Sequence, residues 1–435
     1  MGQQTREADV IVVGGGLAGL AASTYLGRAE RRVILFERAD AAGGRARTRT
    51  LDGFHFNLGP HALYRGGRAA EVLCELGVSV RGRAPGPSGV YAVRSGRLHT
   101  FPVGFVSLLT TGLLSPREKV EAARLLARLR RVDTTPLQRT MLADWLSESI
   151  ESPAVRELVA AAVRVSTYTD DAERLSAGAG LDQLRMAAAG VLYLDGGWQT
   201  IVDGLRRAAE AAGAEVVTHR PVASVLRDPA VRGVTLEDGS SVSAPAVVLA
   251  ASPAEAARLV SGGGRTVVDE WPRQTIPVHA AGLDVGLDRL PNPAALVAIG
   301  VDGPLYLSVH SAVARLAPEG GALIHVMRYG GLRGQPPSTV QARLEGLLSS
   351  VQPGWRGAVV RERFVPEMVV THAMVTAAQG GWAGRFGPAV PDVPGLYVAG
   401  DWVGKEGMLS DASLASARAA AHAILAAPGR AIAAA

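Results

Sequence analysis

A glycine-rich turn near the start of the chain constrains the fold more than any other feature. The turn, Gly14-Gly15-Gly16-Leu17-Ala18-Gly19, follows an apolar run at 10–13 and precedes a helix-like stretch at 20–29. Gly14 permits a tight turn, Gly16 lets a diphosphate approach the backbone beside Leu17 and Ala18, and Gly19 lets the helix pack against the sheet. A second apolar run ends at Glu37, where a carboxylate can accept hydrogen bonds from a ribose. This order of elements predicts a Rossmann-like dinucleotide site.

A second glycine pair follows the acidic residue. Glu37-Arg38 leads into Ala42-Gly43-Gly44-Arg45-Ala46-Arg47-Thr48. This segment resembles the flavin-dependent amine oxidase superfamily, which includes phytoene desaturases and protoporphyrinogen oxidases. Bare glycine backbone at Gly43 and Gly44 and the guanidinium of Arg45 can approach a diphosphate from the side opposite the helix. The resemblance therefore implies FAD as the cofactor, with Arg38 among its neighbours; for Arg47 a solvated loop position is an alternative.

The far end of the chain supports the same resemblance. An apolar run at 396–399 precedes Gly400-Asp401, and Ser410-Asp411 opens a helix of small residues at 412–426. In the resembled superfamily the Gly-Asp pair meets the ribityl and phosphate part of FAD. The helix start, reached through Met408 and Leu409, lies under the flavin pyrimidine ring, where a helix N-terminus would stabilise negative charge. A plain helix cap is a compatible role for Asp411.

These pieces predict a discontinuous nucleotide-binding domain. The fold class is α/β: a Rossmann-like FAD-binding domain of the GR2 type, made of residues 1–60, 196–261 and 386–435. A hairpin with Asp238-Gly239 at its turn belongs to it, and the resemblance implies that the backbone of Val222 meets the adenine. Two insertions, 61–195 and 262–385, build an α+β substrate-binding domain. The first is largely helical, with helices expected at 117–131, 137–149 and 153–164.

Composition excludes several other classes of function. The net charge is +5, but the basic residues are scattered and almost all are Arg, with only Lys119 and Lys405 as lysines, which argues against nucleic acid as a partner. The single cysteine, Cys74, excludes an internal disulfide, and its helical apolar surroundings predict a core position. No metal-binding cluster is apparent. The polar start and the absence of an apolar run of ~18 residues make the cytoplasm the expected compartment.

The resemblance also points to residues near the flavin ring. The loop matching Leu58-Gly59-Pro60-His61 passes close to the ring in the superfamily. We therefore expect Gly59 and Pro60 to contact the cofactor, and His61 and Tyr64 to shape the substrate site. Trp402, directly after Gly400-Asp401, is a third catalytic candidate because an aromatic there could flank the flavin. A hydrogen-bonded loop histidine is the alternative for His61.

The expected chemistry is oxidation of an apolar small molecule by hydride transfer to flavin N5. Many amine oxidases of the superfamily use a lysine near N5, and no lysine occurs between Lys119 and Lys405. This absence favours a desaturase or dehydrogenase over an amine oxidase, which stays the alternative. GDP-dissociation inhibitors share the fold and offer a non-catalytic, lipid-binding alternative. The sequence does not identify the electron acceptor, whether oxygen or a quinone.

The helix expected at 117–131 has a further interpretation. It is basic and amphipathic, so it could lie on anionic lipid as a peripheral membrane contact. Its apolar stripe, which includes Leu125, Leu126 and Leu129, is equally what a helix that faces a protein core would show.

Overall fold

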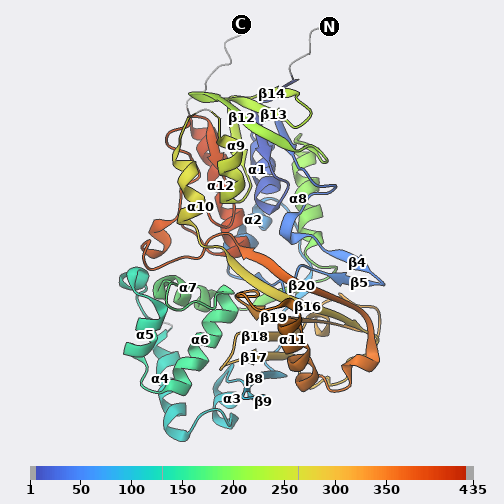
Figure 1. Ribbon diagram of the computed structural model, residues 1–435, viewed down its shortest axis with the longest axis vertical. Helices are drawn as coiled ribbons and strands as arrows, with labels where there is room; N and C mark the ends of the chain where they lie inside the picture. The colour runs from blue at the N-terminus through green and yellow to red at the C-terminus, as the bar shows by residue number, and fades with distance from the viewer. Residues whose placement is uncertain (1–5, 130, 263, 428–435) are drawn as a thin grey trace.

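The computed structural model describes residues 6–129, 131–262 and 264–427, and it has two parts stacked along its longest axis. The upper part in Figure 1 carries both termini, and the lower part carries a large mixed sheet with helices on both sides. The chain crosses between the two parts several times.

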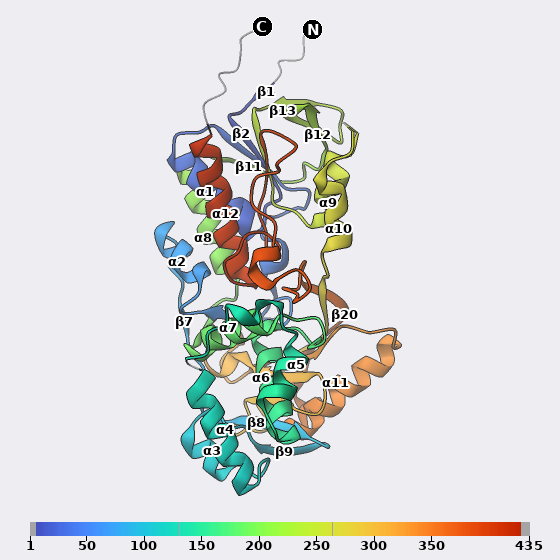
Figure 2. The ribbon, with the colours of Figure 1, turned by 90° about the vertical axis from the view of Figure 1, so that its left-hand side faces the viewer.

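A parallel sheet forms the centre of the upper part. Its strand order is β11-β3-β2-β15-β21, with bounds Glu215–Val217, Val33–Phe36, Val10–Val13, Ala246–Leu249 and Leu396–Val398. β2 and β3 are entirely buried, which is why both are continuous apolar runs. Helices α1 (Leu17–Arg28), α8 (Gln199–Ala211) and α12 (Leu409–Ala426) lie side by side on one face (Figure 2).

The other face of this sheet is covered by a second, smaller sheet and two helices. The smaller sheet has the order β1-β14-β13-β12, with bounds Arg6–Glu7, Ser241–Ser243, Ala230–Leu236 and Val222–Asp228. The hairpin predicted around Asp238-Gly239 connects β13 and β14. Helices α9 (Pro253–Val260) and α10 (Trp271–Gln274) complete this layer. The discontinuous α/β fold is therefore confirmed.

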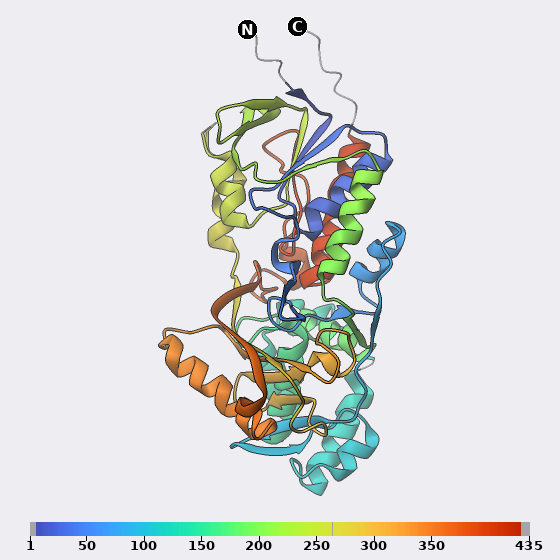
Figure 3. The same cartoon turned by 90° about the vertical axis from the view of Figure 1, so that its right-hand side faces the viewer.

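The lower part is built on a seven-stranded sheet of order β20-β16-β19-β18-β17-β8-β9. Its strands are Val359–Thr371, Val278–Leu287, Ala322–Tyr329, Leu305–Val309, Val297–Gly300, Val90–Arg94 and Arg97–Thr100. Helix α11 (Pro337–Val351) covers the outer face (Figure 3). The opposite side is covered by α4 (Pro116–Leu129), α5 (Leu142–Ser149), α6 (Pro153–Thr167) and α7 (Ala177–Ala188).

Short elements join the two parts. They are β4 (Arg49–Leu51), β5 (Phe54–Phe56), β6 (Leu63–Tyr64), α2 (Arg68–Glu75), β7 (Gly82–Arg83) and β10 (Val191–Leu194). Helix α3 (Phe105–Thr110) instead lies beside α4 in the lower part. Short 3₁₀ helices lie at 44–46, 136–139, 267–270, 310–312, 355–358 and 381–384. β10 pairs with both β6 and β7 at the level where the two parts meet.

Two local predictions were wrong. The helix expected over 137–149 divides into a 3₁₀ helix, Pro136–Arg139, and α5, because the backbone at Thr140 is extended and Met141 forms a bridge with Ser176. Cys74 is exposed rather than in the core. It lies on the outer side of α2, whose buried side is formed by Ala69, Val72 and Leu73.

The division into two domains stays a proposal, and the cores suggest how to refine it. Leu63, Leu73 and Val78 share a core with α1 and α12, although they fall in the first insertion. Val268 and Trp271 share the core on the opposite face of the parallel sheet. We therefore propose to assign segments 63–78 and 267–274 to the nucleotide-binding part.

Candidate functional site

The first glycine turn connects β2 to α1 and is closely packed at two of its glycines. Gly14 has φ +105°, a conformation that favours glycine, and its N–H donates to the Phe36 carbonyl at 2.8 Å. A Cβ on Gly19 would lie 1.9 Å from the Gly14 carbonyl oxygen. A Cβ on Gly16, by contrast, would meet no atom within 4 Å. Gly14 and Gly19 are therefore needed for packing, and Gly16 leaves space for a ligand at the positive end of α1.

Glu37 is held at the end of β3 beside this turn. Its carboxylate accepts the N–H of Gly15 at 2.7 Å and the N–H of Ala39 at 2.8 Å, one on each oxygen. Each carboxylate oxygen has a further lone pair, so both can still accept hydrogen bonds from a ligand hydroxyl. This geometry agrees with the predicted ribose contact.

The second glycine pair lies against the first. The Gly43 N–H donates to the Gly15 carbonyl at 2.7 Å, and a Cβ on Gly44 would have the Gly16 Cα as its nearest neighbour, at 3.7 Å. Both Gly43 and Gly44 have positive φ. The backbones of the two turns therefore lie close enough to approach one diphosphate together.

Arg45 joins three distant segments at this point. Its guanidinium donates to the Val370 carbonyl and to the Asp401 carboxylate, both at 2.8 Å, and its Nη2 lies 3.2 Å from His372 Nδ1. His372 Nδ1 is also 2.9 Å from the second oxygen of Asp401. Burial alone would raise the pKa of Asp401, but Arg45 and His372 outweigh it and hold that pKa well below its usual range. Asp401 is therefore a buried anion between two cationic or hydrogen-bonding partners.

His372 lies outside every motif that the sequence analysis identified. It lines the cavity, directly after β20. No local motif marks it, because its partners are 327 and 29 residues away along the chain.

These residues surround a cavity of about 570 Å³ that runs from the parallel sheet to the lower part. Its size is in the range of small-molecule and cofactor sites, ~300–1,000 Å³. Of the predicted cofactor residues, the lining contains Gly14, Gly16, Leu17, Ala18, Glu37, Arg38, Gly43, Gly44, Arg45, Pro60, His61, Val222, Gly400, Asp401 and Leu409. One cavity thus brings together residues from five separate stretches of sequence.

The cavity ends in an apolar chamber at the lower part, which we define by Leu58, Pro60, Tyr168, Met327 and Met368. The cationic and acidic side chains in the lining come instead from the glycine turns, the residues after β3, the residues that flank the β12–β13 hairpin, α9 and the segments around His372 and Asp401. Such a distribution suits a polar cofactor at one end and an apolar molecule at the other.

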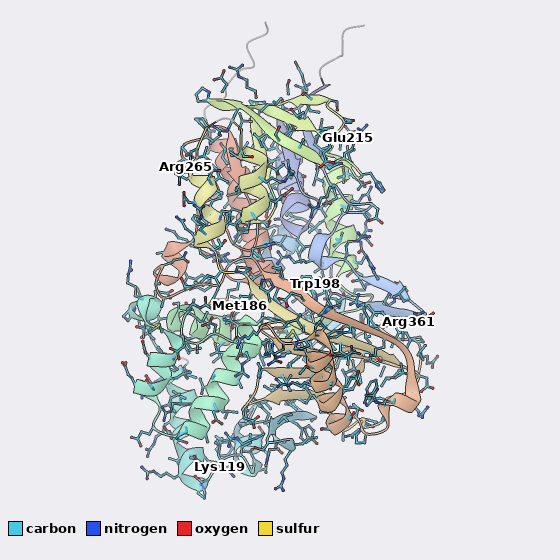
Figure 4. All side chains as sticks on the ribbon, viewed as in Figure 1. Lys119, Met186, Trp198, Glu215, Arg265 and Arg361 are labelled. Carbon is cyan, nitrogen blue, oxygen red and sulfur yellow. The ribbon has the colours of Figure 1, made fainter. Side chains whose placement is uncertain are left out.

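His61 borders the apolar chamber. Its Nδ1 lies 3.1 Å from the Gly59 carbonyl oxygen, which can only accept, so Nδ1 carries the proton and Nε2 is left unprotonated. Its ring packs edge-on against Trp198, which lies where the two parts meet (Figure 4). Burial lowers the pKa of His61 to about 4, so the ring is neutral at pH 7.

Two of the three catalytic candidates lie outside the cavity lining. The Tyr64 hydroxyl donates to the Ser166 carbonyl at 2.8 Å, within the β6–α6 contact. Trp402 is buried on the far side of the Gly400-Asp401 turn, where its Nε1 donates to the Ala251 carbonyl at 2.9 Å and its ring packs on Trp271. In this structure, therefore, neither the Tyr64 nor the Trp402 side chain lines the cavity, and each packs against residues behind the lining.

Three predicted cofactor residues do not line the cavity: Gly19, Gly59 and Met408. Gly19 serves the packing of α1, and Gly59 positions His61 through its carbonyl. The Met408 side chain packs into the core of the lower part.

Asp411 caps a helix other than its own. Its Oδ1 accepts the N–H of Ala69 at 2.7 Å, in the first turn of α2. Burial raises the pKa of Asp411 to about 6. The predicted cap is thus a tertiary contact that fastens α2 to α12.

Comparison with known proteins places this geometry in a family. The model of the flavin-containing amine oxidoreductases matches residues 17–425, which is almost the whole described chain. The chain belongs to this family. Its cofactor is therefore FAD, and the non-catalytic alternative gives way to an FAD-dependent oxidoreductase.

Individual relatives agree with this assignment. The coproporphyrinogen III oxidase of Mycobacterium tuberculosis is 29% identical over 331 residues, 66% of this chain and 71% of the relative. A solved oxidoreductase from Methanosarcina mazei superposes with a TM-score of 0.75 at 20% identity, over 94% of this chain and 98% of that one. Putrescine oxidase bound to putrescine has a TM-score of 0.71 at 17% identity, over 97% and 99% of the two chains. At these identities the two structures establish the fold alone.

The residues present fit FAD. The space above Gly16, where a side chain would project into the cavity, matches a diphosphate at the start of α1, and Glu37 has free lone pairs for a ribose. The Arg45–Asp401–His372 group lies between this polar end and the apolar chamber. We propose these residues as the cofactor contacts.

Proposed function

We propose that this family member dehydrogenates or desaturates an apolar small molecule, with hydride passing from a substrate carbon to flavin N5. The observation that carries the proposal is the apolar chamber at the end of the cavity, with a neutral histidine at its border. When bound, FAD supplies the acceptor for two electrons and one hydrogen. The chain's own residues orient the substrate and exclude water from it.

His61 is the group that we propose to handle the second hydrogen. Removal of a hydride and a proton from neighbouring substrate atoms leaves a double bond, and the proton needs an acceptor. The hydrogen bond from Nδ1 to the Gly59 carbonyl leaves Nε2 of His61 as the accepting nitrogen. Its low pKa makes it a transient carrier that returns readily to the neutral form.

The relatives supply candidate substrates. The M. tuberculosis relative is named for coproporphyrinogen III, so this tetrapyrrole is the first donor to test. Amine oxidation, the second candidate, has the putrescine oxidase fold in its favour. Against it, the carboxylates in the cavity lining, which could pair with a substrate ammonium, all come from the nucleotide-binding part: they are Glu37, Glu237, Glu255 and Asp401.

Anaerobic flavin bleaching tests the proposal. Purified FAD-loaded protein is mixed with coproporphyrinogen III, protoporphyrinogen IX, an apolar polyene or putrescine, and the oxidised flavin band is followed in a stopped-flow instrument. We expect bleaching by a tetrapyrrole or the polyene and none by putrescine. Bleaching by putrescine alone would replace dehydrogenation with amine oxidation. Reoxidation by oxygen or by a soluble quinone then identifies the electron acceptor.

A further inference from the structure

Apolar side chains gather on an exposed tip at the bottom of the molecule. Six of the nine large apolar side chains that are exposed among the described residues fall within 103–126, and we call this region the α3–α4 tip. Its members are Val103, Phe105, Val106, Leu109, Val120 and Leu126. Phe105 and Val106 are each 73% exposed and Leu109 is 55% exposed. Soluble surfaces rarely concentrate apolar residues of this size unless they bind something.

The folding of the tip does not account for these side chains. α3 already has a buried side, formed by Leu108, and α4 faces the core with Ala122, Leu125 and Leu129. The apolar stripe that sequence analysis noted on this helix is thus largely used in the core. Phe105, Val106 and Leu109 lie on the outward side of α3, where the described chain leaves them exposed.

Positive charge predominates on the tip together with the residues that flank it. Residues 97–131, which include the tip, contain seven Arg or Lys and two Glu; one of the seven, Arg130, lies outside the described residues. Both glutamates point toward the start of α6: Glu118 accepts from the Ser152 hydroxyl at 2.7 Å, and Glu121 accepts the N–H of Glu151 at 2.7 Å. The basic groups Arg124 and Arg128 are exposed instead. The outer surface therefore combines apolar and cationic groups.

Lys119 brings a positive charge next to the exposed apolar side chains of α3. Its ammonium donates to the Leu109 carbonyl at 2.6 Å, at the C-terminal end of α3. This hydrogen bond holds the Lys119 ammonium beside Leu109, which is itself one of the exposed apolar residues. Figure 4 shows Lys119 at the lower extremity of the molecule, and Figure 1 shows α3 and α4 at the end opposite the nucleotide-binding sheet.

We propose that the α3–α4 tip docks on the surface of an anionic lipid bilayer. Phe105, Val106 and Leu109 enter the boundary of the acyl layer, and Lys119, Arg124 and Arg128 contact lipid phosphates. Anionic lipid is favoured over an uncharged partner because the exposed charges beside the apolar group are cationic. The contact is peripheral: within the described residues no helix has the length and apolar character needed to cross a bilayer.

Vesicle co-sedimentation of the FAD-loaded protein tests this docking. The probes are phosphatidylcholine vesicles with and without about one-quarter phosphatidylglycerol, at low and at high salt. The patch variant is F105S/V106S/L109S. The matched control is L51S/V267S/V360S, which removes three apolar side chains that are 39%, 40% and 48% exposed elsewhere. R124E/R128E tests the charge without changing the apolar group.

We expect the wild type and the control to bind anionic vesicles and to be released by salt. The patch variant and R124E/R128E should each bind at least about tenfold more weakly, with an unchanged flavin spectrum and melting temperature. Failure of the wild type to bind, or equal loss in the control, would overturn the proposal. So would a lipid-free dimer, seen by sedimentation velocity, that the patch variant converts to monomer, because the tip would then bind a second copy. Vesicle binding is independent of the substrate assays.

Discussion

Gly16→Ala separates the cofactor role of the first turn from its role in folding. A Cβ at this position meets no atom within 4 Å, and the backbone there, at φ −75° and ψ −176°, is accessible to any residue. The apoprotein should therefore keep its stability within about 0.5 kcal/mol, or gain slightly, because alanine restricts the unfolded chain. At Gly19 the same change would place a Cβ 1.9 Å from a carbonyl oxygen, so Gly19→Ala should destabilise the apoprotein.

Gly16→Ala should weaken FAD binding even though it leaves the stability of the apoprotein nearly unchanged. A methyl group on Gly16 projects into the space that we assign to the diphosphate. If one or two charge-assisted hydrogen bonds from the turn are lost, at about 1.5–3 kcal/mol each, the dissociation constant rises at least tenfold. Urea unfolding of the apoprotein and fluorescence titration with FAD measure the two effects. Gly86→Ala, where a Cβ also meets open space, is the control. An FAD affinity within threefold of wild type would refute the path of the diphosphate over Gly16.

Three other variants address the remaining groups. Glu37→Ala should weaken FAD binding about tenfold through loss of a ribose hydrogen bond, and an unchanged dissociation constant would remove the ribose contact. Asp401→Asn should lower the free energy of unfolding by about 2 kcal/mol, which is less than the ~3–5 kcal/mol for a fully buried ion pair because Arg45 is 35% exposed. Since the pKa of Asp401 is lowered on folding, the wild type should lose this contribution as the pH falls below about 4. Asp401→Asn should not show this pH-dependent loss, whereas the control Asp228→Asn, at an exposed residue, should show it as the wild type does. Burial lowers the pKa of His61 to about 4, so the free energy of unfolding should fall as the pH drops from 6.5 toward 4. In urea unfolding, His61→Phe should reduce this dependence of stability on pH. The same variant should slow single-turnover flavin reduction.

Sequence patterns predicted the parts of the site that depend on local backbone. The glycine turns, the carboxylate after β3 and the Gly-Asp turn before α12 all require a particular conformation within a few residues. Such requirements are visible along one stretch of chain. Hence Gly16, Glu37 and Gly44 were found at the cavity.

Long-range contacts were beyond the same patterns. His372 meets Arg45 from 327 residues away, and Met327 and Met368 reach the chamber from strands whose registers the sequence does not specify. Trp402 illustrates the reverse error: its neighbour Asp401 faces the cavity, yet the indole turns to Trp271 on the other side. Neighbours in sequence share a site only when the turn between them directs both side chains the same way.

The central sheet also sets the order in which the site can be completed. β15 pairs on one side with β2, from the start of the chain, and on the other with β21, close to its end. Because synthesis proceeds from the N-terminus, the glycine turn leaves the ribosome long before Asp401 and α12. A nascent chain therefore exposes a diphosphate-binding turn without the strand and helix that close the cavity behind it. Stable retention of FAD must therefore wait until Asp401 and α12 have also emerged.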